Sequence, residues 1–201
     1  MTAAERMTAW ILGAAVAVAA GVAVLLGRGS RKLQKGASVL LIGDSHAVGL
    51  DHHLAGNLGA ALAACGLDYL AVPVGGTGAP YWAAKLPALM GSGSTRPWDV
   101  VLISVGGNDF RRTDPVAVLD AVRAIVATAK SHGARLIWLE PTIMPFADKI
   151  NVRGMWADTG VERFPTLDLE PLPRVADQIH LTWDGYKTWV AALADYLCPA
   201  A

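Results

Sequence analysis

Short apolar runs of strand length alternate along this chain with segments that have helical spacing. A continuous apolar run of about 4–8 residues is typical of a strand that is buried on both faces of a parallel sheet. Five such runs follow one another, at Ser38–Ile42, Tyr69–Val72, Val100–Val105, Leu136–Leu139 and near Arg163–Leu167.

Helical patterns fill the intervals between these runs. Leucine recurs at every fourth position from Leu50 to Leu62, which predicts one helix with a single apolar stripe. Strands that alternate with helices form a parallel sheet covered on both faces. We therefore predict an α/β fold, a three-layer sandwich with about five parallel strands. The other expected helices are Tyr81–Met90, Pro115–Ser131 and one from Thr182 to a stop at Pro199.

Length and charge narrow the class of protein. At 201 residues the chain is long enough for one well-buried domain and too short for two ordinary ones. Its 17 basic and 17 acidic side chains balance, so no nucleic-acid partner is indicated. No pattern in the sequence specifies an oligomeric state.

Residues 7–27 form an uncharged apolar segment near the N-terminus. About 20 such residues span a bilayer as a helix, so we expect one N-terminal hydrophobic helix that anchors the chain in a membrane by a single pass. A cleaved signal segment is the alternative, with Ala17–Ala19 as a small-residue site. The expected organisation is an anchor at 1–27, a basic linker at 28–37 and a folded domain at 38–201.

The membrane side of that domain is open at this stage. The basic residues that follow the apolar segment outweigh Arg6 before it, and the positive-inside rule then places the domain in the cytoplasm. The resemblance described below points instead outside the cytoplasm. The basic residues in question are Arg28, Arg31, Lys32 and Lys35.

Candidate catalytic residues follow the predicted strands directly, where active sites of open α/β sheets lie. Gly43-Asp44-Ser45 comes after the first strand, so a serine hydroxyl and its backbone N–H can meet at a helix N-terminus. The alternative is that Ser45 only caps the helix.

Two glycine-rich blocks follow the second and third strands. Glycines at 75, 76 and 78 let backbone N–H groups approach a ligand closely, and the block Gly106–Asp109 offers the neutral carboxamide of Asn108. Both groups suit an oxyanion hole. Each block taken alone is also ordinary turn composition.

Asp177 and His180 precede the last predicted helix. An imidazole activates a serine hydroxyl by taking its proton, and a carboxylate on the other ring nitrogen fixes the tautomer. Three residues of loop let Asp177 fold back under His180. The alternative is a pair of capping residues.

Together, these four blocks resemble those of the SGNH (GDSL-type) hydrolases in order, strand-end placement and spacing, over about residues 38–197. The resemblance implies a flavodoxin-like doubly wound sheet, Ser45 as nucleophile, and Asp177 and His180 as acid and base. It also implies an oxyanion hole made by the N–H of Ser45, Gly78 and Asn108. One departure is Pro73, where many relatives carry Asn.

The implied function is a serine esterase without cofactor or metal, which acts through an acyl-serine on a small-molecule or carbohydrate ester. O-acetyl groups on a cell-envelope carbohydrate are the expected substrate. A thioesterase or lysophospholipase fits the same class. Alternatives are an O-acyltransferase with the same acyl-serine and a non-catalytic carbohydrate-binding domain. Expected substrate contacts, for which core packing is the alternative, are Trp82, Phe110 and Trp183.

The remaining histidines and the two cysteines have plainer expected roles. His46, His52 and His53 lack acidic or Cys partners at metal-ligand spacing, so surface or capping roles are expected. Cys65 and Cys198 are two unrelated buried thiols in the plain interpretation. In the sheet implied by the resemblance, however, their helices end side by side opposite the active site. A bridge there would favour an oxidising compartment.

Overall fold

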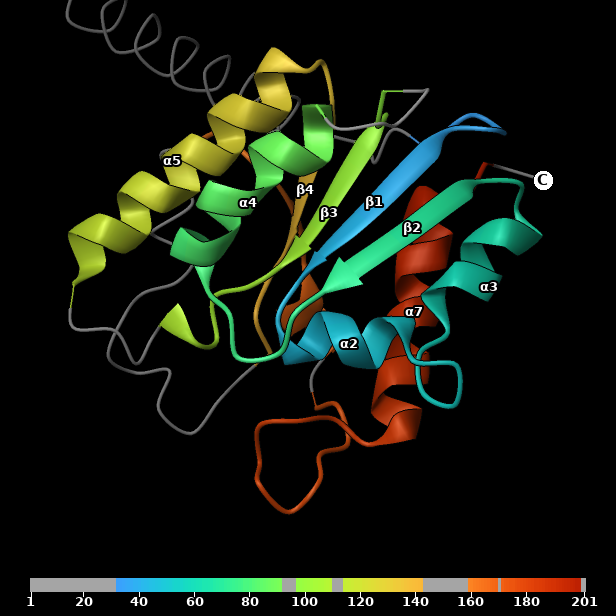
Figure 1. Cartoon of the computed structure of the whole chain (residues 1–201). Helices are drawn as coiled ribbons and strands as arrows, with labels where there is room; N and C mark the ends of the chain where they lie inside the picture. The colour runs from blue at the N-terminus through green and yellow to red at the C-terminus, as the bar shows by residue number, and fades with distance from the viewer. Residues whose placement is uncertain (1–31, 92–96, 110–113, 143–158, 170, 200–201) are drawn as a thin grey trace, which may run out of the picture. The chain divides into compact units, whose positions relative to one another are not determined.

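The computed structural model describes residues 32–91, 97–109, 114–142, 159–169 and 171–199 (Figure 1). The chain divides into two units, Met1–Lys32 and Leu33–Ala201, and the fold below is that of the second. The predicted N-terminal hydrophobic helix lies outside the described residues. Within the described ranges, none of the helices combines the length and hydropathy that a bilayer crossing needs.

Five strands form one fully parallel sheet in the order β2-β1-β3-β4-β5. This is the doubly wound order in which the chain starts near the centre and reverses direction between β1 and β3. The five-stranded parallel sheet predicted from the apolar runs is therefore confirmed. The strands are β1 (Ser38–Gly43), β2 (Asp68–Pro73), β3 (Val100–Ser104), β4 (Arg135–Leu139) and β5 (Glu162–Phe164).

Two hydrophobic clusters, one on each face of the sheet, make the fold a three-layer sandwich. Successive strand side chains point to opposite faces, so in β1 Val39 and Leu41 enter one cluster while Leu40 and Ile42 enter the other. The helices that cover the first face are α2 (Ser45–Asp51), α3 (Leu58–Ala64) and α7 (Trp183–Leu197). Those on the second are α4 (Ala79–Gly91) and α5 (Pro115–Ser131) (Figure 1).

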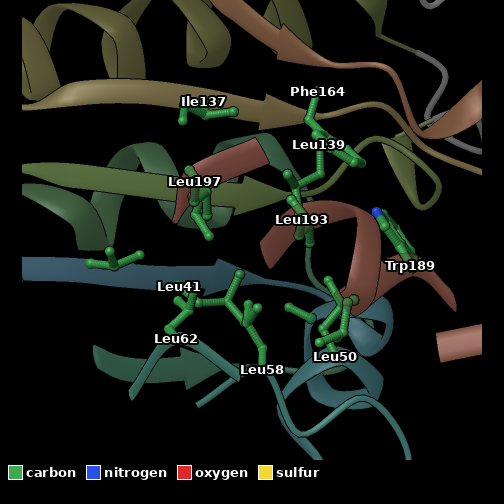
Figure 2. Packing of buried hydrophobic residues seen from close by; sticks show 14 of the residues in the cluster. Leu41, Leu50, Leu58, Leu62, Ile137, Leu139, Phe164, Trp189, Leu193 and Leu197 are labelled. Carbon is green, nitrogen blue, oxygen red and sulfur yellow. The ribbon is translucent and has the colours of Figure 1, made fainter. Parts of the chain in front are cut away.

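The first cluster joins α7 to the centre of the sheet. Leu193 and Leu197 of α7 lie over Leu139 and Leu41, and all four are fully buried (Figure 2). Burial of a leucine side chain contributes about 1.5–3 kcal/mol. The position of α7, and of the loop that enters it, is therefore set by apolar packing on the sheet.

The single helix predicted from the leucine stripe is wrong. The structure has two short helices, α2 and α3, and Leu54 in the turn between them is 49% exposed. Asn57 adopts a left-handed backbone with φ of 51°, and a Cβ at Gly56 would lie 2.4 Å from the carbonyl oxygen of Leu50. The chain thus folds back tightly between the two helices. Leu54, which a continuous helix would place on one stripe with Leu50 and Leu58, lies in this turn and is exposed.

The fifth strand is shorter than predicted. It ends at Phe164, and Pro165, which has no N–H to donate, is followed by a 3-10 helix over Thr166–Leu169. Most of the segment between β4 and β5, residues 143–158, lies outside the described residues.

Cys65 and Cys198 form a disulfide with a Cα–Cα distance of 5.8 Å. Each cysteine is the C-terminal cap residue of its helix, α3 or α7. The backbone N–H of Leu33, just before β1, donates to the carbonyl of Leu197 at 2.8 Å, so the disulfide lies at the amino edge of the sheet. The interpretation as two unrelated thiols is wrong, and the expected meeting of the two helix ends is confirmed.

Candidate active site

The nucleophile candidate stands at the carboxyl end of β1, where the strand passes directly into α2. Gly43 permits the sharp turn, since its φ is 153° and a Cβ there would lie 2.3 Å from the carbonyl oxygen of Ser104. Asp44 caps the helix by accepting a hydrogen bond from the backbone N–H of His46 at 2.9 Å. The cap is therefore Asp44, which leaves the hydroxyl of Ser45 free of capping.

Three side chains from distant parts of the sequence meet at this edge. His180 Nε2 lies 2.9 Å from Ser45 Oγ, and His180 Nδ1 lies 2.6 Å from Asp177 Oδ2. Hydrogen bonding from His180 lowers the pKa of Asp177 to about 2, with help from the backbone N–H of Ile179. The ionised carboxylate keeps the proton on Nδ1, so the unprotonated Nε2 faces the serine hydroxyl.

The loop before α7, which contains His180, lies at the end of the sheet to which the strand arrows point (Figure 1). The N–H of Val175 donates to the carbonyl of His180 at 3.0 Å, and Arg174 donates to the carbonyl of Ile179 at 3.1 Å. Gln178 takes a left-handed backbone conformation with φ of 59°. The side chain of His180 remains 39% exposed, so it is accessible to a substrate from solvent.

Asn108 lies beyond the end of β3 with its carboxamide held in one orientation. Its Nδ2 donates to the carbonyl of Thr77 at 2.9 Å and lies 3.5 Å from Asp44 Oδ2. A carboxamide nitrogen has two N–H groups. The bond to Thr77 uses one of them, and the other donates a longer bond to Oδ2 of Asp44, the residue before the nucleophile.

Gly78 is required by close packing as well as by the role the resemblance implies. A Cβ at Gly78 would lie 2.2 Å from Asp109 Oδ1. Asp109 is buried and accepts hydrogen bonds from the N–H of Ala79 at 2.9 and 3.1 Å. The glycine therefore lets the block after β2 approach the block after β3, and its role as an oxyanion donor stays a prediction.

Asp44 is a buried carboxyl with an unusual proton affinity. Burial, the largest cause, raises its pKa from 3.8 to about 7; the hydrogen bond from His46 N–H opposes this shift, and the charge of Asp109 adds to it. Asp44 is only 2% exposed. Its protonation is therefore linked to the stability of the fold.

We expect Asp44→Asn to become more stable relative to the wild type as the pH rises. The wild-type carboxyl ionises near pH 4 when unfolded and near pH 7 when folded, so the folded state binds more protons between these values and loses stability as the pH rises through them. Asn can still cap α2 but cannot ionise. Denaturant unfolding from pH 4 to 8 should show a relative gain of up to about 4 kcal/mol; a constant difference would contradict the raised pKa.

The three predicted substrate contacts have different outcomes. Trp82 is 1% exposed and its indole N–H donates to Thr77 Oγ1 at 2.9 Å, so it belongs to the core and its predicted contact with substrate is wrong. Phe110 lies outside the described residues. Trp183 is 56% exposed at the first turn of α7, three residues after His180.

His46 and Tyr186 lie beside the candidate active site, although the sequence did not predict either of them there. His46 is 3% exposed, so its expected surface role is wrong, whereas His52 and His53 are exposed and stack at 4.7 Å. Tyr186 Oη lies 3.2 Å from His46 Nδ1. Tyr186 shares the apolar stripe of α7 with Val190, so its sequence pattern indicates only core packing.

Several solved structures share this fold. The chain is similar to LAE5, an alpha/beta hydrolase enzyme from the metagenome of Lake Arreo, Spain, with 17% identity, a TM-score of 0.65, and coverage of 82% of this chain and 96% of that one. TesA is 23% identical with a TM-score of 0.64, and the match covers 79% of this chain and 97% of that one. Axe2, an acetylxylan esterase from Geobacillus stearothermophilus, is 17% identical with a TM-score of 0.63, and the match covers 82% of this chain and 95% of that one.

Sequence comparison identifies the family directly. No curated protein sequence matches this chain. The profile of the GDSL-like Lipase/Acylhydrolase family matches residues 41–196, a span that contains all four blocks at the strand ends and before α7. The chain therefore belongs to the GDSL-like lipase/acylhydrolase family, and it is an ester hydrolase.

Proposed function

We propose that this protein is a serine esterase that works through a covalent acyl-serine on Ser45. The observation that carries the proposal is the contact chain Ser45 Oγ–His180 Nε2–Asp177, with distances of 2.9 and 2.6 Å. A hydroxyl, an imidazole and a carboxylate in this order constitute an activated nucleophile.

The geometry supports a two-step acyl transfer. His180 Nε2 takes the proton of Ser45 as Oγ attacks the ester carbonyl carbon, and Asp177 stabilises the resulting imidazolium. The imidazolium then gives that proton to the leaving alcohol as the C–O bond breaks. In the second step His180 deprotonates a water molecule, which attacks the acyl-serine and releases the carboxylic acid. N–H groups of Ser45, Gly78 and Asn108 are proposed to stabilise the oxyanion of each step.

We expect Asn108→Ala to lower kcat by roughly 10²–10³, the usual effect of removing one oxyanion donor. KM should change less, because the donor bonds the oxyanion more strongly than the ground-state carbonyl. Initial-rate kinetics on a small ester test this, with thermal unfolding to confirm the fold. A near-normal kcat would mean that Asn108 only fastens the turn to Thr77.

The proposed substrate is an O-acetyl group on a cell-envelope carbohydrate. Trp183 supports this, because an exposed aromatic side chain three residues after His180 suits stacking against a sugar ring. The shared fold with the acetylxylan esterase Axe2 is in keeping with it. Trp183 is accordingly proposed to bind the carbohydrate rather than to take part in the chemistry.

The full-length chain should be assayed against p-nitrophenyl esters of graded acyl length and against acetylated oligosaccharides. We expect acetyl to be the preferred acyl group, and Trp183→Ala to raise KM for the acetylated sugar while leaving p-nitrophenyl acetate unaffected. A preference for long acyl chains, thioesters or lysophospholipids would show that the substrate is another ester or thioester and not an acetylated carbohydrate. Acyl transfer to an added sugar would identify an O-acyltransferase, and absence of all turnover a carbohydrate-binding domain.

We further propose that residues 7–27 tether the domain to a membrane and that the domain lies outside the cytoplasm. The Cys65–Cys198 pairing supports this side, because disulfides persist in oxidising compartments and are rare in the cytosol. Protein taken from its native membrane and alkylated before reduction should show no free thiol by mass spectrometry. Two alkylated cysteines would favour the cytoplasmic side that the basic flank indicates.

A further inference from the structure

His46 and Tyr186 form a buried polar pair directly behind the catalytic candidates. His46 Nδ1 lies 3.2 Å from Tyr186 Oη, and the two residues are 3% and 5% exposed. The ring of His46 lies 5.7 Å from that of His180, centroid to centroid. The pair therefore connects the residue after Ser45 to the helix that follows His180.

Tyr186 also contacts the helix that begins with the nucleophile. Its ring packs on Gly49, one turn after Ser45, so closely that a Cβ there would lie 2.2–2.5 Å from ring carbons. The aromatic ring thus fixes the spacing of α7 from α2, and only glycine at position 49 leaves room for it.

The direction of the His46–Tyr186 hydrogen bond follows from the protonation of the phenol. Burial, the largest cause, raises the pKa of Tyr186 to about 12, so the phenol keeps its proton. We therefore assign Tyr186 Oη as the donor and His46 Nδ1 as the acceptor. Tyr186 stands on α7 and His46 on α2, so the bond is a bridge between the helix after the base and the helix that begins with the nucleophile.

Burial of the His46–Tyr186 pair lowers the stability of the fold, which indicates a role beyond packing. Nε2 of His46 has no hydrogen-bond partner among the described residues, and an unsatisfied buried polar atom costs stability. A leucine would fill the same apolar surroundings without that cost. Burial, with a smaller effect of His180, lowers the pKa of His46 to about 3, so the ring is neutral and adds no charge beside the base.

We propose that His46 and Tyr186 are positioning residues that hold His180 Nε2 against Ser45 Oγ through the Tyr186–His46 bridge between α7 and α2. The proposal rests on the proposed function, because it assigns meaning to the Ser45–His180 contact. His180 stands on a partly exposed surface loop, so a buried anchor next to it restricts the movements that would lengthen the 2.9 Å contact.

The test compares Tyr186→Phe, His46→Leu and the double variant in the full-length chain. Each single variant should lower kcat on p-nitrophenyl acetate by roughly 10- to 100-fold, with KM within about twofold, because misplacing a catalytic group by a fraction of an ångström slows the chemical step. The double variant should be no slower than the worse single one, because both substitutions break the same bridge. The melting temperature of His46→Leu should equal or exceed that of the wild type.

Two further variants make the result specific. Tyr196→Phe removes a hydroxyl from the far end of the same helix, where it bonds Glu162, and should leave kcat unchanged. His46→Asn keeps an acceptor near the place of Nδ1 and should be faster than His46→Leu.

Unchanged kcat in Tyr186→Phe, additive losses in the double variant, or an Asn variant no faster than Leu would overturn the proposal. So would losses of kcat that only follow losses of thermal stability. Ser45→Ala, assayed in parallel, separates a failure of the proposed function from a failure of the positioning role. If Ser45→Ala retains turnover, the proposed function is wrong. If Ser45→Ala is inactive while the His46 and Tyr186 variants keep wild-type kcat, only the positioning role is wrong.

Discussion

Ser45→Ala is expected to abolish ester hydrolysis, with kcat lower by about 10⁴-fold or more. The methyl group cannot form the acyl intermediate, and the remaining oxyanion donors act only on a slow direct attack by water. Steady-state kinetics on p-nitrophenyl acetate measure the loss. A fluorophosphonate probe, which reacts covalently with activated serines, should label the wild type and not the variant.

The control for this result is a serine that the structure places elsewhere. Ser131 is exposed at the end of α5 and its hydroxyl donates to the carbonyl of Thr128 at 2.9 Å, so Ser131→Ala should keep both activity and labelling. The melting temperature of Ser45→Ala should match the wild type, because among the described residues the Ser45 hydroxyl bonds only His180 in the surface loop. Labelling that persists in Ser45→Ala would place the nucleophile at another residue.

Removal of the disulfide, by Cys65→Ser with Cys198→Ser, is expected to cost about 2–5 kcal/mol of unfolding free energy. The cysteines are 133 residues apart, and a bridge across so long a loop restricts the unfolded chain strongly. For a domain of this size the melting temperature should fall by roughly 5–15 °C. Denaturant and thermal unfolding of the oxidised wild type and the double variant provide the measurement.

Activity gives the control for this second prediction. The disulfide lies at the amino edge of the sheet and the Ser45–His180 contact at the carboxyl edge, so kcat at a temperature below the transition should be close to the wild-type value. Wild-type protein unfolded in the presence of a reductant should match the double variant. Equal stability of the oxidised protein and the variant would contradict a constraint on the unfolded chain.

The strands, and the edge of the sheet at which the active site lies, were predictable because they depend on local sequence patterns. Apolar runs mark the strands whatever surrounds them, and the rule that parallel sheets place their sites at the carboxyl ends directed attention to the residues after each run. Ser45 and Asn108 were found in this way, whereas the Asp177–His180 pair was found from its spacing before the last helix. The structure brings His180 into direct contact with both Ser45 and Asp177.

The missed features depend on contacts between segments far apart in sequence. The leucine stripe continues through the turn between α2 and α3, and nothing local reveals that Gly56 packs against the backbone of Leu50. The position of Trp82 in the sequence predicted a contact with substrate, but its indole N–H bonds Thr77 inside the core. The burial of His46 likewise follows from the position of Tyr186, 140 residues away.

The Cys65–Cys198 bond turns most of the domain into a covalent ring. Asp177 and His180 lie inside this ring, and Ser45 lies on the chain outside it. A protease that cuts once anywhere between the two cysteines, including in the surface loop that holds His180, therefore leaves both fragments attached to each other. On an electrophoresis gel such a nicked molecule would migrate as one chain until a reductant is added. A first cut of this kind would thus not separate Ser45 from Asp177 and His180.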